Sequence, residues 1–123
     1  MFFVLKERNI HGIYKNAAQI VSSKGFSQTL IYDPYSKSVD LIGAILLACG
    51  ASEKLMHEGE TEAELLGIPE GRIIDLMLAI EFLEASVDGD IAEWCSNHLM
   101  GDAVSLLKRL SDRIEMSVVR QKG

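Results

Sequence analysis

The chain has 123 residues, of which 48% are hydrophobic and 24% charged, with a formal net charge of −6. This length and composition suit one globular domain and exclude a disordered chain or two independent domains. Residues 51–100 hold twelve acidic and two basic side chains, a net charge of −10, whereas residues 1–50 and 101–123 each carry +2. The charge excludes a general nucleic-acid binder, which needs a basic face to displace counterions from phosphates.

Two sequence features bear on the compartment. The apolar start at residues 1–5 precedes its charges, whereas a signal peptide places charges first and a longer apolar run after them. The longest apolar run, at residues 41–49, is less than half of a bilayer span. Cys49 and Cys95 are too few for a disulfide scaffold, and we expect both to be buried thiols. The sequence therefore predicts a cytoplasmic protein without membrane association.

The first predicted helix occupies residues 10–24, with Asn9 as its N-cap and Gly25 at its C-terminus. Its buried face is predicted by six side chains at three- and four-residue steps: Ile10, Ile13, Tyr14, Ala17, Ala18 and Val21. Residues 29–32 have β-strand composition before a turn, and we expect them to form a short β-hairpin with residues 2–5.

The next helix, at residues 41–49, is apolar on every side, which is typical of a central helix surrounded by others. Ser38 or Asp40 is expected to cap its start. Gly43 has no side chain, so it predicts close approach of a neighbouring helix at that position.

The most regular helical pattern follows Pro69, a residue suited to the first turn of a helix. Before it, Thr61 and Glu64 have the spacing of a capping box for a short helix. The predicted buried stripe of the long helix is Ile73, Leu76, Met77, Ile80, Leu83 and Val87, widened by Ile74 and Phe82. Asp75, Glu81 and Glu84 fall outside this stripe, so we expect them on the solvent face.

Two further helices complete the chain. Asp90 is expected to cap one in which Ile91, Trp94, Cys95 and Leu99 face the same way, and Asp102 to cap the last. The last helix should bury Ala103, Leu107, Leu110, Ile114 and Val118, with residues 119–123 frayed. The predicted fold is therefore a mainly α, compact bundle of five to six helices, forming a single domain over residues 1–118.

Three landmarks resemble a family of small helical proteins of unknown function found in actinobacterial and phage-type genomes. They are the run from Ala17-Ala18-Gln19 to Gly25-Phe26-Ser27-Gln28, the pair Gly43-Ala44, and Trp94 ahead of Val104, Leu106 and Leu107. Cys95-Ser96 stands where members often have Asn-Asp, and Asp40-Leu41-Ile42 where they often have a cysteine. The resemblance implies a compact, mainly helical fold and no particular activity.

The sequence gives little support for a catalytic or metal-binding site. Cys95 and His98 are three residues apart on a predicted helix, a spacing that can offer two metal ligands or a thiol beside a base. No second Cys or His pair has ligand spacing, and no third group or oxyanion hole is near in sequence. The acidic run at residues 57–64 lacks EF-hand spacing and is expected to be a solvated loop and helix start. We therefore expect no catalytic residue, cofactor or metal.

Three hypotheses of function remain open. The first is a non-enzymatic interaction module that presents Asp75, Glu81 and Glu84 to a basic protein partner, or to the basic ends of a second copy. The second is a small-ligand-binding protein or enzyme with a pocket near Trp94, Cys95 and His98, beside one of two tyrosines, Tyr14 or Tyr32. The third is an acidic mimic of nucleic acid, which requires many carboxylates on one continuous face.

Overall fold

A computed structural model of the protein describes residues 2–122, with side chains described for residues 4–116. Over this range the chain forms seven α-helices and one 3-10 helix: α1 (Phe2–Glu7), α2 (Ile10–Lys24), α3 (Leu41–Ala48), α4 (Glu53–His57), η1 (Ala63–Leu65), α5 (Glu70–Ser86), α6 (Ile91–Ser96) and α7 (Met100–Lys122). The prediction of a mainly α fold is confirmed. None of the helices in this range is long and apolar enough to cross a membrane.

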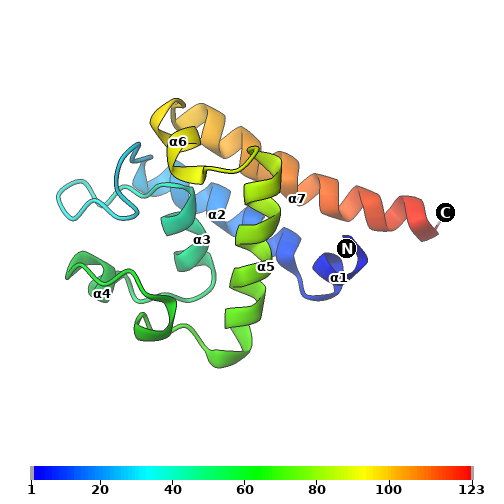
Figure 1. The fold of residues 1–123 in the computed structure, drawn as a ribbon, viewed down its shortest axis with the longest axis horizontal. Coiled ribbons are helices and arrows are strands. Elements are labelled where there is room, and N and C mark those ends of the chain that lie inside the picture. The colour runs from blue at the N-terminus through cyan, green and yellow to red at the C-terminus, as the bar shows by residue number, and fades with distance from the viewer. Residues whose placement is uncertain (1, 123) are drawn as a thin grey trace.

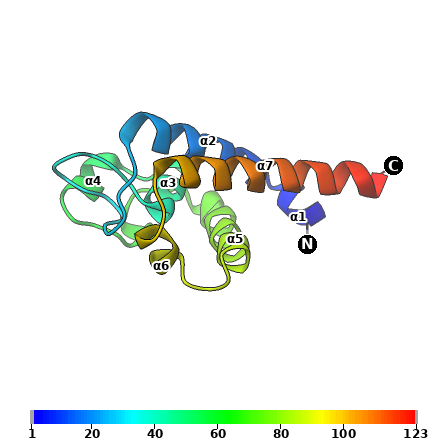
Figure 2. The same cartoon turned by 90° about the horizontal axis from the view of Figure 1, so that it is seen from above.

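The helices pack around α2. Helices α2 and α7 lie side by side along the molecule, and α5 runs across them (Figures 1 and 2). Helix α2 contacts α1, α3, α5 and α7, so it is the central helix, a place that the sequence predicted for α3. The predicted domain limits, residues 1–118 with a frayed tail at 119–123, stay a prediction, because side chains beyond residue 116 and all of Gly123 lie outside the described part.

The predicted buried face of α2 is confirmed at all six positions: Ile10, Ile13, Tyr14, Ala17, Ala18 and Val21. Asn9 occupies the N-cap position as predicted, but its backbone is left-handed with φ 61° and its side chain makes no capping hydrogen bond. Gly25 ends the helix as predicted: its φ of 95° suits glycine, and its N–H donates to the Val21 carbonyl at 2.8 Å.

The predicted β-hairpin is wrong. Residues 2–5 belong to α1, which buries Leu5, and residues 29–32 contribute only an isolated bridge between Tyr32 and Val39. The Tyr32 hydroxyl instead donates to Glu53 on α4 at 2.8 Å. The backbone of this segment pairs with the residues that precede α3: the Ile31 carbonyl accepts the Asp40 N–H at 3.3 Å, and the Asp33 N–H donates to the Ser38 carbonyl at 2.9 Å.

The start of α3 explains how this loop is attached. Of the two candidate caps, Ser38 and Asp40, the N-cap is Asp40, whose carboxylate accepts the Gly43 N–H at 2.8 Å. A Cβ on Gly43 would lie 2.0 Å from the Ile31 carbonyl oxygen. The close approach predicted at Gly43 therefore exists, but the neighbour is the loop backbone at Ile31 and not a second helix.

The predicted caps of the later helices are confirmed only in part. The capping box at Thr61 and Glu64 is wrong, because the Glu60 carboxylate accepts the backbone N–H groups of residues 61 and 62 and a single 3-10 turn follows. Asp90 caps α6 as predicted, accepting the Glu93 N–H at 3.1 Å. Asp102 lies inside the first turn of α7, where its carboxylate accepts the Leu99 N–H at 3.1 Å. Leu99 itself is exposed, contrary to the prediction.

Candidate functional site

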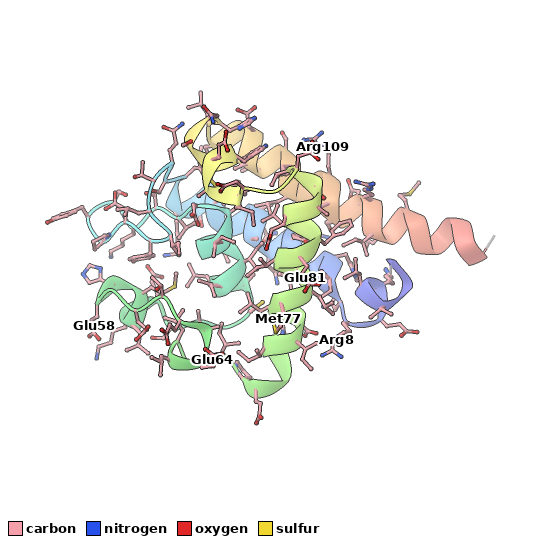
Figure 3. The ribbon with its side chains drawn as sticks, in the orientation of Figure 1. Arg8, Glu58, Glu64, Met77, Glu81 and Arg109 are labelled. Atoms are coloured by element: carbon pink, nitrogen blue, oxygen red, sulfur yellow. The ribbon has the colours of Figure 1, made fainter. Side chains whose placement is uncertain are left out.

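The solvent side of α5 combines apolar and acidic side chains. Five exposed residues follow one another at four- and three-residue steps, and we call them the α5 face: Glu70, Ile74, Met77, Glu81 and Glu84. Ile74 is 54% exposed and Met77 57% exposed. Figure 3 shows Met77 and Glu81 on this helix, with Glu64 of η1 nearby. The face thus presents two large apolar side chains between carboxylates.

Asp75 is not part of this face, so its predicted solvent position is wrong. It is only 7% exposed and lies between two arginines. The Nε of Arg8 lies 2.7 Å from Oδ1 of Asp75, in a hydrogen-bonded ion pair. The Nε of Arg72 lies 3.3 Å from Oδ2, close enough for an ion pair but without hydrogen-bond alignment. Of the predicted partner face, only Glu81 and Glu84 are exposed.

The reason for this difference is the rotation of α5 about its axis. The buried residues are Asp75, Leu76, Ala79, Phe82 and Leu83, whereas Met77 of the predicted stripe points to solvent. The small Ala79 lets α2 come close, and the Tyr14 hydroxyl donates to the Ala79 carbonyl. Because apolar residues occur on nearly every side of α5, periodicity does not single out one face. Ile74 and Met77 were therefore missed as surface residues.

A shallow cavity of about 470 Å³ continues the α5 face toward α6. Its lining combines apolar side chains with two carboxylates: Ile42, Ile80, Glu84, Gly89, Asp90, Ile91 and Ala92. Glu84 belongs to both the cavity and the α5 face, so the two surfaces are continuous. On the other flank, η1 contacts α5 and adds the exposed Leu65. The whole surface offers apolar contact area with negative charge at its margins.

The residues of the predicted pocket do not all line one cavity in the structure. The rings of Trp94 and His98 stack, with centroids 3.8 Å apart and planes 6° apart, and Nδ1 of His98 lies 2.7 Å from the Trp94 carbonyl oxygen. Both line a cavity of about 270 Å³ together with three carboxylates, Asp88, Asp90 and Glu93. Cys95 points into the core and is 1% exposed, and neither Tyr14 nor Tyr32 lines this cavity.

The two cysteines are free and buried, as predicted. Burial raises the pKa of Cys95 to about 11, and it raises the pKa of Cys49 to about 11 despite the nearby Arg72. Both side chains are therefore neutral thiols near neutral pH, which is the form that does not act as a nucleophile. Within the described part of the chain, no group of three or more His, Cys, Asp or Glu residues is placed to hold a metal ion.

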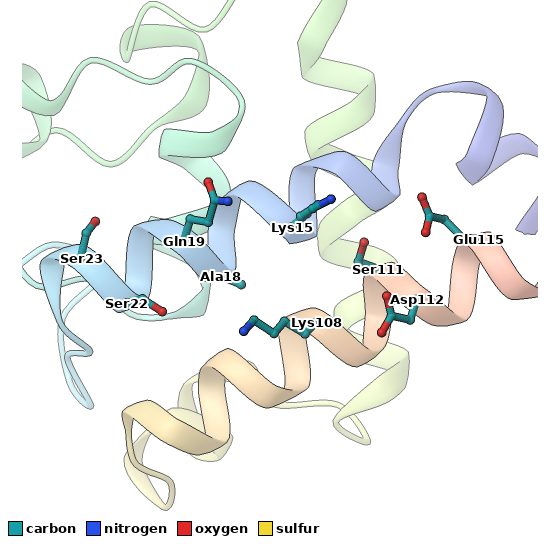
Figure 4. A pocket seen from close by; sticks show the side chains of 9 residues that line it. All are labelled: Lys15, Ala18, Gln19, Ser22, Ser23, Lys108, Ser111, Asp112 and Glu115. Carbon is teal, nitrogen blue, oxygen red and sulfur yellow. The ribbon is translucent and has the colours of Figure 1, made fainter.

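A groove of about 570 Å³ lies between α2 and α7, and sequence reasoning did not single it out. Figure 4 shows Lys15 on α2 and Lys108, Asp112 and Glu115 on α7 along its walls. Glu115 is engaged by His11, whose Nε2 lies 3.4 Å from its carboxylate. Because both signs of charge line the groove, its electrostatics favour no particular class of ligand.

Compared with family models, with curated proteins and with solved structures, the chain matches none of them. The resemblance to small helical proteins of actinobacterial and phage-type genomes therefore stays a prediction.

Proposed function

We propose that the protein is a non-enzymatic interaction module whose α5 face binds a basic, amphipathic segment of a partner protein. The observation that carries this proposal is the exposure of Ile74 and Met77 between Glu70 on one side and Glu81 and Glu84 on the other. Large apolar side chains exposed together on one surface are typical of interaction sites. The flanking carboxylates select a partner whose own apolar residues are flanked by lysine or arginine.

The structure also offers less support for the two other hypotheses, a nucleic-acid mimic and a pocket at Trp94. A mimic of nucleic acid needs a row of anions, whereas Ile74 and Met77 interrupt the row on α5. In the second hypothesis, the pocket at Trp94 was expected to include Cys95, which is buried in the core. A cytoplasmic location remains part of the proposal, supported by the two free buried thiols, which a reducing compartment preserves.

The test uses a fluorescein-labelled helical peptide of leucine and lysine, compared with the same peptide carrying glutamate in place of lysine. We expect saturable binding of the lysine peptide in fluorescence anisotropy, and no binding of the glutamate peptide. The double variant I74N/M77S removes the apolar contacts and should weaken binding about tenfold. The double variant E81Q/E84Q removes the flanking charge and should slow association, most strongly at low salt.

The matched control is E58Q/E62Q, which makes the same change of charge at two exposed positions between α4 and η1. Equal loss of binding in this control would mean that net charge alone attracts the peptide, and would overturn the role of the α5 face. An alternative partner for the α5 face is the basic C-terminal segment of a second copy, residues 101–123, which carries a net charge of +2. Sedimentation of the protein without peptide, at low and at high salt, tests this alternative. If the protein forms an oligomer that high salt weakens and E81Q/E84Q abolishes, the α5 face binds a second copy of the chain and not another protein.

A further inference from the structure

The groove of about 570 Å³ between α2 and α7 lies away from the α5 face. Helix α5 passes in front of α2 and α7 in Figure 1 and behind them in Figure 4, so the groove opens on the other side of the molecule. Its charged lining consists of two lysines, Lys15 and Lys108, and two carboxylates, Asp112 and Glu115, which together carry no net charge. In a protein of net charge −6, two copies can approach each other at this neutral surface with little repulsion.

The groove contains a nearly buried hydroxyl group that the fold leaves without a partner. Ser111 is only 4% exposed and lines the groove, and its oxygen points from α7 toward the α2 side in Figure 4. Among the described residues, none forms a hydrogen bond with this hydroxyl. A polar group with so little access to water is stabilised by an occupant that hydrogen-bonds to it. The groove therefore suits an occupant with polar side chains.

The α7 wall of the groove has a pattern that is complementary to itself. Residues at four-residue steps form a ridge along a helix, and we call one such row the α7 ridge: Val104, Lys108, Asp112 and Met116. Lys108 and Asp112 are exposed and form no ion pair with a described residue, and Met116 is 53% exposed. Read in the opposite direction, the ridge again has apolar ends and two inner charges, now of exchanged sign. Both signs of charge favour no class of small ligand, but they are what a contact between two identical surfaces requires.

We propose that a second copy of the chain occupies this surface, forming a dimer in which the two α7 ridges cross antiparallel and each lies over the α2–α7 groove of the other copy. A two-fold axis at the level of residue 110 places Lys108 of each copy against Asp112 of the other, and Val104 against Met116. Because the apolar area of the ridge is small, the dimer is a weak and reversible one. It does not depend on the α5 face, which lies on the other side of the molecule.

Sedimentation velocity over a range of protein concentrations at low salt measures the dimer. We expect the wild-type protein to dimerise and high salt to weaken the dimer. K108D places carboxylates opposite each other at both contacts, and D112K places lysines there. Each variant should therefore raise the dissociation constant at least about tenfold. Both positions are exposed, so circular dichroism should show unchanged helicity.

A mixture of K108D and D112K in equal amounts tests the two-fold pairing directly. In the mixed dimer one copy has two carboxylates at these positions and the other has two lysines, so both contacts again join opposite charges. We expect this mixture to form a heterodimer with an affinity close to that of the wild-type dimer. The matched control is R109D, which makes the same change of charge as K108D at the exposed neighbouring residue, outside the groove lining. It should change the dissociation constant less than about threefold.

Two measurements separate this dimer from binding at the α5 face. E81Q/E84Q should not abolish the dimer, and K108D should bind the lysine peptide as the wild-type protein does. A wild-type protein that stays monomeric at every concentration, equal effects of K108D and R109D, or a mixture of K108D and D112K that does not dimerise would each overturn the proposal.

Discussion

The carboxylate of Asp75 on α5 lies 2.7 Å from Nε of Arg8, a residue 67 positions earlier in the turn between α1 and α2. This ion pair joins two segments that are distant in sequence. The pair forms in only one rotation of α5 about its axis, because successive residues of a helix point about 100° apart. With Asp75 directed inward, Ile74 and Met77 are directed to solvent. The pairing of Asp75 with Arg8 thus accompanies the burial of Leu76, Ala79, Phe82 and Leu83 and the exposure of the α5 face.

The first prediction concerns this ion pair. D75A leaves the guanidinium groups of Arg8 and Arg72 without their carboxylate, so it should lower the free energy of unfolding by about 2–3 kcal/mol. The partial exposure of both arginines keeps the loss below that of a fully buried pair. Urea unfolding followed by circular dichroism measures it. E81A, which removes an exposed carboxylate from the same helix, should change stability by less than about 0.5 kcal/mol; equal losses would contradict the role assigned to Asp75.

The second prediction concerns the contact between Gly43 and the loop. In G43A the new Cβ would lie 2.0 Å from the Ile31 carbonyl, so the loop must move and the protein should lose about 3 kcal/mol or more of stability. G71A is the matched control, because a Cβ on Gly71 in the first turn of α5 meets nothing within 4 Å. There alanine should stabilise the protein by about 0.5–1 kcal/mol through its better helix propensity. Thermal unfolding of both variants distinguishes the two effects; a tolerated G43A would show that the loop is not closely packed.

The third prediction concerns the pH dependence of stability. Burial raises the pKa of the Asp40 carboxyl from its ordinary value of 3.8 to about 6, although the Gly43 N–H partly offsets this effect. Between these two values the native state binds more protons than the unfolded state. The contribution of Asp40 to stability is therefore fully present below about pH 4 and is lost as the pH rises through 6.

D40N keeps a capping oxygen but has no charge to bury. Relative to wild type, it should gain stability between pH 4 and pH 7, by up to about 3 kcal/mol. Urea unfolding of both proteins over this range gives the difference. The matched control is D90N, which makes the same substitution at the exposed N-cap of α6. A D40N profile parallel to that of wild type would show that Asp40 does not titrate in this window.

The fourth prediction concerns the reactivity of the thiols. Because burial raises the pKa of both cysteines to about 11 and excludes reagents, Cys49 and Cys95 should react slowly with iodoacetamide at pH 8 in the folded protein. The rate should rise in urea together with unfolding. S96C places a thiol at an exposed position next to Cys95 and should react rapidly in the folded state. Rapid modification of Cys95 in the wild-type protein would contradict its placement in the core.

Much of the fold follows from local sequence. The buried face of α2, its C-terminal Gly25 and the N-caps Asp40 and Asp90 were all predicted correctly. Each depends on interactions within a few residues: the helical period, the left-handed backbone of glycine, or a carboxylate that accepts a nearby N–H. The capping box at Thr61 and Glu64 failed because the Glu60 carboxylate accepts the Thr61 N–H, which the box assigns to the Glu64 side chain, and also accepts the Glu62 N–H.

The sequence by itself determined that this protein is mainly α, that its acid excess lies within residues 51–100, and which side of α2 is buried. The tertiary structure decided which side of α5 is exposed, because a helix with apolar residues on most sides can bury several of its faces. Packing against Tyr14 and the pairing of Asp75 with Arg8 selected one of them. The tertiary structure also decided that Cys95 points into the core while its neighbour Trp94 lines two cavities at the surface, because this depends on how α6 packs against the rest of the molecule and not on any local pattern.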